Sequence, residues 1–330
     1  MGGHSKEGRL QTYVVVNPQS AGGATGRRWP EMSVMLEQGI GPFEYALTQY
    51  PGHATKLARL AIADGHKRII AIGGDGTVNE VVNGMLDASG MLDVDTPANP
   101  APDDLSLGMI DAGTGGDFAK NIGLPKGLDT QIEVLRAGQT RPMGLGLATF
   151  SGPADGLPTR RFFTVLCSAG ISSAINGYVN AAPRLKRYGN SVAFAVAAVH
   201  TIFTYKNAPV KISIDGEPLL EGPILLCAAC NGPLVGGGMK LAPEADVFAD
   251  ELGFMIGGDI KLAHRLGLFS RLYQGRHVGR RDVHSIKGSA LVVEDMSDQK
   301  TLVDIDGDVI GTLPLTVEAV PKALHVCCPR

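Results

Sequence analysis

The residues best suited to chemistry lie in a glycine-rich turn, Gly73–Gly74–Asp75–Gly76–Thr77. A short β-branched run, Ile69–Ile72, leads into this turn, and an amphipathic segment begins directly after it. Glycine lets a backbone approach a ligand closely and adopt positive φ, and the N–H groups of a first helical turn attract anions. The pattern therefore indicates a phosphate-binding turn. It is neither the dinucleotide fingerprint G-x-G-x-x-G nor a P-loop, because no Gly-Lys-Ser/Thr follows.

The helix after this turn is expected to run from Thr77 to about Leu86. Thr77 is the predicted N-cap, and Glu80, three residues later, would complete a capping box. The alternative is an ordinary strand, turn and helix that binds no ligand.

Two further small-residue loops follow predicted strands, at Asn17–Gly23 and at Asp111–Ala119. A carboxylate pair at Asp306–Gly307–Asp308 offers general-base chemistry, although Asp-Gly between two strands is also an ordinary hairpin turn. A second acidic stretch of this kind, Asp215–Gly216–Glu217, is interpreted as a turn and kept as a rival.

Size and composition indicate a soluble globular protein with room for two domains. The chain has 330 residues, of which 44% are hydrophobic and 19% charged, and its net charge is −3. This charge provides no global field to recruit nucleic acid or anionic lipid. The first ten residues do not have the pattern of a secretory signal, and apolar runs such as Val192–Val199 are shorter than the roughly 20 residues of a membrane span. Five cysteines suggest no disulfide framework, and Cys227–Cys230 is interpreted as part of a buried strand.

The first part of the chain, residues 1–140, alternates strands and helices, which favours a doubly wound parallel sheet. Strands are expected at Thr12–Asn17, Phe43–Thr48, Ile69–Ile72 and Ser106–Ile110, and helices at Trp29–Gln38, after Gly52 and after Thr77. The segment from Ala88 to Leu105 is interpreted as a surface loop. Ligands of such sheets bind at the carboxyl ends of the strands, where all three loops lie.

The second part, residues 141–330, is predicted to be a mostly antiparallel β domain, because short strands recur with turns between them. The expected strands are Phe162–Ser168, Pro209–Ile214, Ile224–Cys230, Leu252–Ile256, Val283–Ile286, Ala290–Val293, Leu302–Ile305, Leu315–Val320 and Leu324–Cys328. Helices are expected near Ile171–Asn180, Ser191–Thr204 and Leu262–Tyr273. The last strands are candidates to return to the first domain.

The turn and the residues behind it resemble the Gly-Gly-Asp-Gly-Thr-x-Asn-Glu-Val motif of the diacylglycerol kinase catalytic family, which includes bacterial lipid kinases and sphingosine and ceramide kinases. NAD kinases share the first five residues, whereas Asn79–Glu80–Val81 favours the lipid kinases. Other segments resemble family motifs: 17–23, 111–119, 231–243 and 306–308. In 111–119 the family has asparagine where this chain has Gly116. The resemblance implies an α/β nucleotide domain followed by a β-sandwich.

The resemblance further implies an ATP- and Mg²⁺-dependent kinase that phosphorylates a hydroxyl of a membrane lipid such as diacylglycerol. By the same resemblance, Asp308 stands at the position of the general base, although the family has glutamate there, and Asp75 and Asp117 would hold Mg²⁺ or its waters. The implied nucleotide-site residues are Asn17, Ser20, Gly22, Thr48, Gly73, Gly74, Asp75, Gly76, Thr77, Val78, Asn79, Glu80 and Thr114. A structural metal site would use Val247, Asp250 and Leu252, with Glu251 standing where the family has glycine.

Three alternatives remain: a sphingoid-base or ceramide kinase, an NAD kinase-like enzyme, and a nucleotide-binding relative without catalysis. The substitutions at Gly116, Glu251 and Asp308 keep the last of these alternatives open. The basic amphipathic segment Lys261–Arg276 is expected to pack on its own core, and an interfacial role is its alternative. We expect a cytoplasmic protein in peripheral contact with the membrane, with no nucleic-acid partner and no transmembrane segment. The sequence leaves open whether it forms a homodimer.

Overall fold

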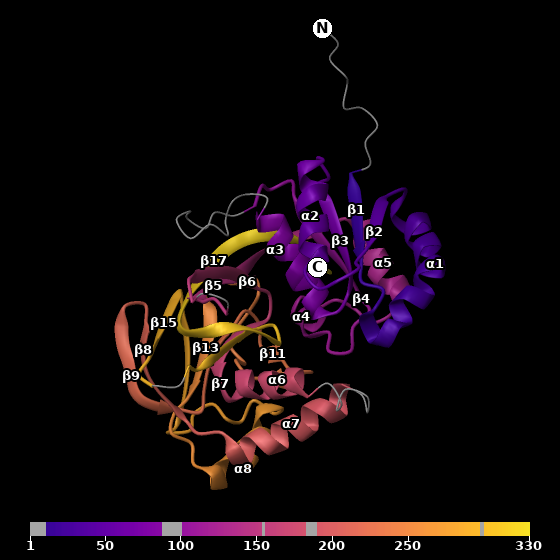
Figure 1. Cartoon of the computed structure of the whole chain (residues 1–330). Helices are drawn as coiled ribbons and strands as arrows, with labels where there is room; N and C mark the ends of the chain where they lie inside the picture. The colour runs from indigo at the N-terminus through magenta and orange to yellow at the C-terminus, as the bar shows by residue number, and fades with distance from the viewer. Residues whose placement is uncertain (1–10, 88–100, 154–155, 183–189, 298–299) are drawn as a thin grey trace. The chain divides into compact units, whose positions relative to one another are not determined.

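The computed structural model describes residues 11–87, 101–153, 156–182, 190–297 and 300–330, which form two compact units (Figure 1). The first unit contains the described residues up to 87 together with 101–142 and 324–330, and the second contains the remainder of 143–323. The chain thus leaves the first unit and returns to it at its end. Most of the predicted loop from Ala88 to Leu105 lies outside the described residues.

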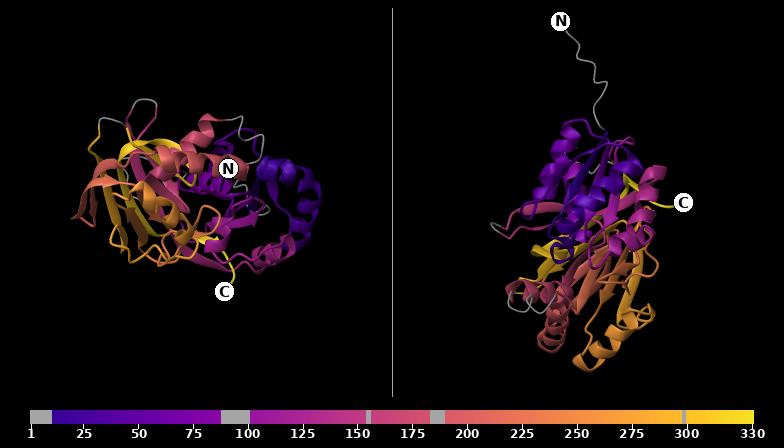
Figure 2. Two further views of the ribbon diagram at one scale, coloured as in Figure 1. Left: turned by 90° about the horizontal axis from the view of Figure 1, so that it is seen from below. Right: turned by 90° about the vertical axis from the view of Figure 1, so that its right-hand side faces the viewer.

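The first unit is built on a parallel sheet with the order β2-β1-β3-β4-β17. The strands are β1 (Thr12–Val16), β2 (Glu44–Leu47), β3 (Arg68–Gly73), β4 (Ser106–Asp111) and the last residues of β17 (Asp308–Cys327). β1, β3 and β4 are continuous apolar runs, as expected for strands buried on both faces. The yellow C-terminal end of the chain can be followed into this unit in Figure 2, where His325 and Val326 pair with Ser106 and Leu107.

Helices cover both faces of this sheet (Figure 1). α1 (Ser20–Ile40) and α5 (Leu128–Ala137) pack together on one face, and α2 (His53–Ala63) and α3 (Asp75–Asp87) pack together on the other. The short α4 (Asp117–Asn121) follows β4. The core between α1, α5 and the sheet contains Val14, Val16, Trp29, Met32, Leu36, Ile70, Ile72, Ile110, Ile132 and Leu135.

The second unit is a sandwich of two antiparallel sheets that share the long strand β17. One sheet has the order β14-β13-β10-β7-β16-β17 and the other β9-β8-β15-β17-β5-β6. The strands are β5 (Thr140–Ser151), β6 (Pro158–Phe163), β7 (Leu166–Gly170), β8 (Ala208–Ile214), β9 (Glu217–Ile224), β10 (Leu226–Cys230), β13 (Leu252–Gly257), β14 (Val283–Gly288), β15 (Ala290–Asp295) and β16 (Leu302–Ile305). A separate hairpin, β11 (Leu234–Val235) and β12 (Met239–Lys240), encloses the triple glycine 236–238.

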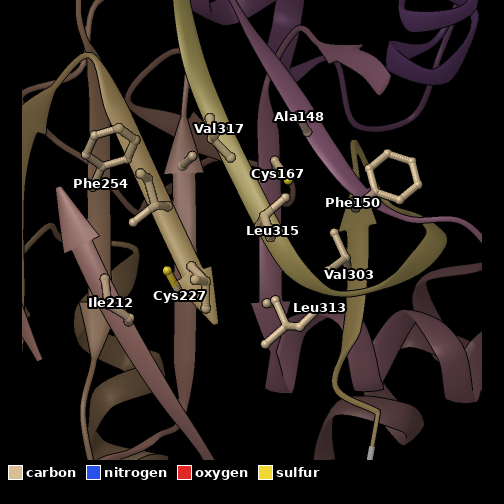
Figure 3. Close-up of a cluster of buried hydrophobic side chains, with 14 of the residues drawn as sticks. Ala148, Phe150, Cys167, Ile212, Cys227, Phe254, Val303, Leu313, Leu315 and Val317 are labelled. Atoms are coloured by element: carbon tan, nitrogen blue, oxygen red, sulfur yellow. The ribbon is translucent and has the colours of Figure 1, made fainter. Parts of the chain in front are cut away.

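The core of the sandwich lies between the two sheets, and Figure 3 shows part of it. Side chains from β17, such as Leu315 and Val317, face Phe254 of β13 and Cys227 of β10 within one buried cluster. All five cysteines are buried free thiols. Burial raises the pKa of the Cys227 thiol to about 12, so this residue behaves as an apolar core side chain.

The helices in the described part of the second unit are α6 (Ile171–Ala181), α7 (Asn190–Thr204) and α8 (Leu262–Leu272). α7 packs against both α6 and α8. Arg265 of α8 is buried, and its guanidinium donates to the carbonyl oxygens of Ile202 and Tyr205 at 2.9 Å. This charged group therefore ties α8 to the C-terminal end of α7.

Several predicted boundaries are wrong. The expected strand Phe162–Ser168 is two strands, β6 and β7, and the expected strands Leu315–Val320 and Leu324–Cys328 are one, β17. β5 and β9 are absent from the prediction, because glycine and proline interrupt both sequences and mimic turns. α1 begins at Ser20 and not at Trp29, with a non-helical stretch at residues 21–23.

Candidate active site

Three turns meet at the carboxyl ends of β1, β3 and β4. The side-chain amide of Asn17, just after β1, donates to Thr77 Oγ1 at 3.0 Å. The turn after β3 faces the turn after β4, where a Cβ added to Gly74 would lie 3.2 Å from the Cα of Gly113. The segments predicted to bind nucleotide are therefore neighbours in the fold, at the end of the sheet where ligands of parallel sheets bind.

Close packing explains two glycines of the central turn, Gly73 and Gly74. Gly73, Gly74 and Gly76 do not have positive φ, so the expectation of left-handed backbone there is wrong. A Cβ on Gly73 would lie 2.4 Å from Thr77 Oγ1, and one on Gly113 would lie 2.5 Å from the Cα of Gly74. A side chain on Gly73 would displace Thr77, and one on Gly74 or Gly113 would push the turns after β3 and β4 apart. A Cβ added to Gly76 would have no atom within 4 Å, so packing does not explain that glycine.

Left-handed backbone occurs instead in the loop after β1. Ala21, Gly22 and Gly23 have φ of 51°, 64° and 83° within the first turns of α1. Ser20 begins that helix, and its N–H donates to the carbonyl oxygen of Asn17 at 3.2 Å. Ser20 and Gly22 thus sit directly after β1, beside Asn17.

Asp75 links two helices of the first unit. It is the first residue of α3, and its carboxylate accepts hydrogen bonds from the backbone N–H of Asp117 at 3.2 Å and of Phe118 at 3.0 Å. These N–H groups open α4, so the carboxylate caps that helix and interacts favourably with the positive end of its dipole. Asp75 is therefore held at the junction of the two turns, and a metal role for it stays a prediction.

The predicted capping box at the start of α3 is wrong. α3 begins at Asp75, which makes Thr77 an interior residue whose buried hydroxyl accepts from Asn17. Glu80 accepts from the backbone N–H of Gly52 at 2.8 Å and of Ala54 at 3.1 Å. It thus caps the neighbouring helix α2, a use that spacing within one helix cannot reveal.

Asp117 and Asp111 bring further charge to the turn after β4. Asp117 is buried and forms an ion pair with Lys120 at 3.0 Å. Asp111, the last residue of β4, accepts from the N–H of Gly113 at 3.1 Å, and burial raises the pKa of its carboxyl above the ordinary value. Asp111 is missing from the sequence prediction. Its position at the end of a buried strand is the signal that could have identified it.

The remaining predicted nucleotide residues differ in their accessibility. Val78 and Asn79 are fully buried on α3, where Asn79 accepts from the amide of Asn83. Thr48 follows β2 and is half-buried, whereas Thr114 is exposed in the turn after β4. Val78 and Asn79 therefore belong to the buried part of α3 behind the turn, and direct ligand contact for them stays a prediction.

The predicted general base lies at a hairpin of the second unit. Asp306 and Gly307 form the turn between β16 and β17, with φ of 48° and 93°, and Asp308 opens β17. The Asp306 carboxylate accepts from the backbone of Thr164, Val165 and Leu166, which fixes the turn. The Asp308 side chain is 67% exposed, 3.7 Å from Arg161.

The rival stretch has the same geometry. Asp215 and Gly216 have φ of 50° and 83° between β8 and β9, and the carboxylate of Asp215 accepts from Ser289 N and Ala290 N. Glu217 then opens β9 and is exposed. Both stretches are hairpins, as their alternative interpretation expected, so turn geometry alone does not distinguish Asp308 from Glu217.

The predicted structural metal site lies in an irregular segment before β13. The carbonyl oxygen of Val247 accepts from Gly144 N at 2.9 Å, and Asp250 and Glu251 are exposed. Leu252 begins β13 and is buried. Among the described residues, no group of three or more histidine, cysteine, aspartate and glutamate side chains is arranged to hold a metal ion. A metal bound at Val247, Asp250 and Leu252 stays a prediction.

A buried carboxyl outside the predicted set joins α6 to the sandwich. Asp304 of β16 accepts from the hydroxyls of Ser168 and Ser173 and from the amide of Asn176. Burial raises its pKa from 3.8 to about 6, although the three donors act in the opposite direction.

Apolar side chains form an exposed surface on α7 and α8, which we call the α7–α8 stripe. Its members are Val192, Val196, Val199 and Phe203 of α7 and Leu262 and Leu266 of α8, each between 43% and 56% exposed. The spacing of the α7 residues places them on one side of the helix. The segment Lys261–Arg276 was expected to pack on its own core through Leu262, Leu266, Phe269 and Leu272. That expectation is right for Leu272, which is buried, and wrong for Leu262 and Leu266, while the side chain of Phe269 lies outside the described part of the structure.

Comparisons with known proteins agree with the architecture. Residues 11–148 match the diacylglycerol kinase catalytic domain, and residues 165–328 match the YegS C-terminal NAD kinase beta sandwich-like domain. A diacylglycerol kinase of Bacillus subtilis is 26% identical over 96% of both chains, and one of Mycobacterium tuberculosis is 26% identical over 84% of this chain and 82% of its own.

Solved structures show the same fold. A diacylglycerol kinase from Bacillus anthracis has a TM-score of 0.66 at 18% identity, covering 97% of both chains. Yeast NADH kinase has a TM-score of 0.54 at 12% identity, covering 98% of this chain and 84% of its own. The predicted fold class, a doubly wound α/β domain followed by a mostly antiparallel β-sandwich, is confirmed. The chain belongs to the diacylglycerol kinase catalytic domain family.

Proposed function

We propose that this protein is an ATP-dependent lipid kinase that transfers the γ-phosphate of ATP to a hydroxyl of a membrane lipid such as diacylglycerol. The observation that carries the proposal is the meeting of three turns at the carboxyl ends of β1, β3 and β4. The Asn17–Thr77 hydrogen bond and the glycine contact between Gly74 and Gly113 hold these turns together. Backbone N–H groups at the start of α3 are suited to phosphate oxygens there.

The chemistry of this region suits Mg²⁺, which accompanies ATP in phosphoryl transfer. Mg²⁺ takes oxygen ligands and is usually held by one or two carboxylates together with substrate phosphates, so a preformed cage of three side chains is not required. Asp75 and Asp117 are the predicted ligands, directly or through water. The cation would neutralise charge on the γ-phosphate, while the turns hold the nucleotide in position.

Proton removal from the acceptor hydroxyl needs a carboxylate, and we assign it to Asp308. Its side chain is exposed and lies 3.7 Å from the guanidinium of Arg161. Asp306 is unsuited to this role because backbone and hydroxyl donors already surround its carboxylate. Glu217 is the competing candidate.

A lipid acceptor is supported by the α7–α8 stripe. Exposed cations accompany its apolar side chains: Lys206, Lys261 and Arg271, of which Lys261 pairs with Asp259. Apolar area with basic neighbours is what a helix needs to lie in the surface of an anionic membrane. No helix among the described residues has the length and hydropathy to cross a membrane. A cavity of about 590 Å³ adjoins the end of α7 and is lined in part by Ala174, Tyr205 and Leu302, a size suited to part of a lipid.

The proposal is tested by offering labelled ATP and Mg²⁺ to the protein with diacylglycerol, sphingosine and ceramide in mixed micelles, and with NAD in buffer. We expect transfer to a lipid. Transfer to NAD and to no lipid would identify an NAD kinase, whereas ATP binding without transfer to any acceptor would identify a non-catalytic relative.

Two variants test the assigned residues. Asp308→Ala should abolish transfer while ATP binding survives, because the base contacts the acceptor and not the nucleotide, and Glu217→Ala is its control. Full activity in Asp308→Ala with loss in Glu217→Ala would reverse the assignment. Asp75→Asn should reduce turnover by roughly two to three orders of magnitude through lost electrostatic positioning.

A further inference from the structure

The space beside Gly116 is already occupied. Gly116 precedes α4 with φ 61° and ψ 34°, a left-handed conformation that asparagine tolerates better than most residues. A Cβ added there would lie 2.4 Å from Oδ2 of Asp111. The Asp111 carboxylate therefore fills the place that a side chain at position 116 would enter.

The Asp111 carboxylate is held by its neighbours. The backbone N–H of Asp111 donates to Oε1 of Gln131 at 3.0 Å, and the amide of Gln131 donates to the carbonyl oxygen of Pro125 at 2.9 Å. Oδ1 of Asp111 accepts from Gly113 N at 3.1 Å, which directs Oδ2 toward Gly116. A polar group aimed from a strand end in this way is preorganised and loses little entropy on binding.

We propose that Asp111 supplies, from the end of β4, the polar side chain that this chain lacks at position 116, and that its carboxylate positions Mg²⁺·ATP through the water shell of the metal. The inference rests on the proposed kinase function and adds a positioning residue to that site. The resembling family has asparagine at position 116, so a polar group is kept in the same place but comes from a different strand position. A carboxylate repels phosphate oxygens and attracts a hydrated cation. The Asp111 carboxylate is therefore expected to accept hydrogen bonds from the waters bound to Mg²⁺.

This arrangement predicts that positions 111 and 116 compensate for each other. Asparagine at position 116 would collide with Asp111, whereas shortening Asp111 to alanine would remove both the collision and the carboxylate. A chain with both changes would recover a polar side chain in the same space. The two single changes are therefore expected to be more harmful than their combination.

The test is isothermal titration calorimetry with Mg²⁺·ATP, and with ATP in the presence of EDTA, on the full chain. Asp111→Ala and Gly116→Asn should each weaken Mg²⁺·ATP binding about tenfold, the loss expected for one contact to a charged group. The binding of metal-free ATP should be weakened less by these two changes. The double variant Asp111→Ala/Gly116→Asn should return to within about threefold of the wild type, a coupling typical of residues in contact. Asp104→Ala is the control, because Asp104 pairs with Lys67 before the opposite end of β4.

Two results would overturn the inference alone: Mg²⁺·ATP binding by Asp111→Ala equal to that of the wild type, or a double variant as weak as the product of the single losses. Circular dichroism checks folding. If Gly116→Asn does not fold, Asp111→Asn decides, because it keeps the shape and removes the charge; it should also weaken Mg²⁺·ATP binding about tenfold. A wild type that binds no Mg²⁺·ATP would remove the proposed function together with this inference.

Discussion

The buried carboxyl of Asp304 makes a sharp prediction about stability and pH. Replacing it with asparagine keeps the size of the side chain and an oxygen that can accept from Ser168 and Ser173. The change removes the titrating carboxyl group from position 304. The amide of Asn176, which donates to Asp304 at 3.1 Å, can turn its oxygen toward the new amide.

The magnitude follows from the pKa. Burial raises the Asp304 pKa from 3.8 to about 6, a difference of about 2 units, and each unit corresponds to about 1.4 kcal/mol. Between these pH values the folded chain binds more protons than the unfolded chain, so the free energy of unfolding falls as pH rises. The contribution of Asp304 to the free energy of unfolding is fully present below about pH 4. About 3 kcal/mol of it is lost by about pH 7.

The assay is urea unfolding followed by far-ultraviolet circular dichroism at pH 4, 5, 6 and 7, for the wild type and Asp304→Asn. Other groups titrate in both proteins, so the difference between the two isolates Asp304. The single tryptophan, Trp29, lies in the first unit, and its fluorescence identifies the transition of that unit. We expect the stability of the wild type, relative to the variant, to fall by about 3 kcal/mol from pH 4 to pH 7. A flat or rising difference would refute the argument that burial dominates at Asp304.

Three further predictions concern the turns and the stripe. Gly74→Val should abolish ATP binding measured by calorimetry, because its side chain would force Gly113 away; unchanged affinity in the folded variant would make the turn purely structural. Glu80→Ala should lower the free energy of unfolding by about 2 kcal/mol, because α2 loses its cap, and Glu80→Gln should have a stability between those of the wild type and Glu80→Ala. Equal stability of the wild type and both variants would contradict the capping role. Val199→Ser/Phe203→Ser should weaken sedimentation with phosphatidylglycerol vesicles severalfold without changing ATP binding in solution. Equal binding to the vesicles would exclude the α7–α8 stripe from membrane contact.

The sequence was most informative where one strand and one turn carry the signal. Continuous apolar runs identified β1, β3 and β4, and the small residues after each identified the turns that meet in the fold. Position at a strand end is a local property, and the topology of parallel sheets then brings such ends together. The family resemblance added the β-sandwich, whose strands are individually short and ambiguous.

Contacts between segments that are distant in the sequence could not be predicted from the sequence. Glu80 has the right spacing for a capping box with Thr77, yet it caps α2 because the packing of α2 against α3 brings Gly52 and Ala54 closer. Asp304 stands in a strand as an unremarkable polar residue until α6 brings Ser173 and Asn176 to it. Spacing predicts partners within one element, whereas partners in another element depend on the tertiary structure.

The acidic residues of the glycine-rich motif hold the fold as well as standing in the proposed site, and this changes how their variants must be interpreted. Asp75 caps α4 through Asp117 N and Phe118 N, so Asp75→Asn removes a charge from the site and also weakens the contact between two turns. Losing one charge-assisted hydrogen bond costs about 1.5 to 3 kcal/mol, which is comparable with the loss of a functional contact. The three effects of Asp75→Asn can be compared as free energies: the loss of folding stability, the loss of ATP binding and the rise in the activation barrier for phosphoryl transfer. Lost turnover is evidence for a catalytic role only if the rise in the barrier exceeds each of the other two. A variant whose turnover falls only as far as its ATP affinity would instead identify Asp75 as the residue that keeps the nucleotide turns together.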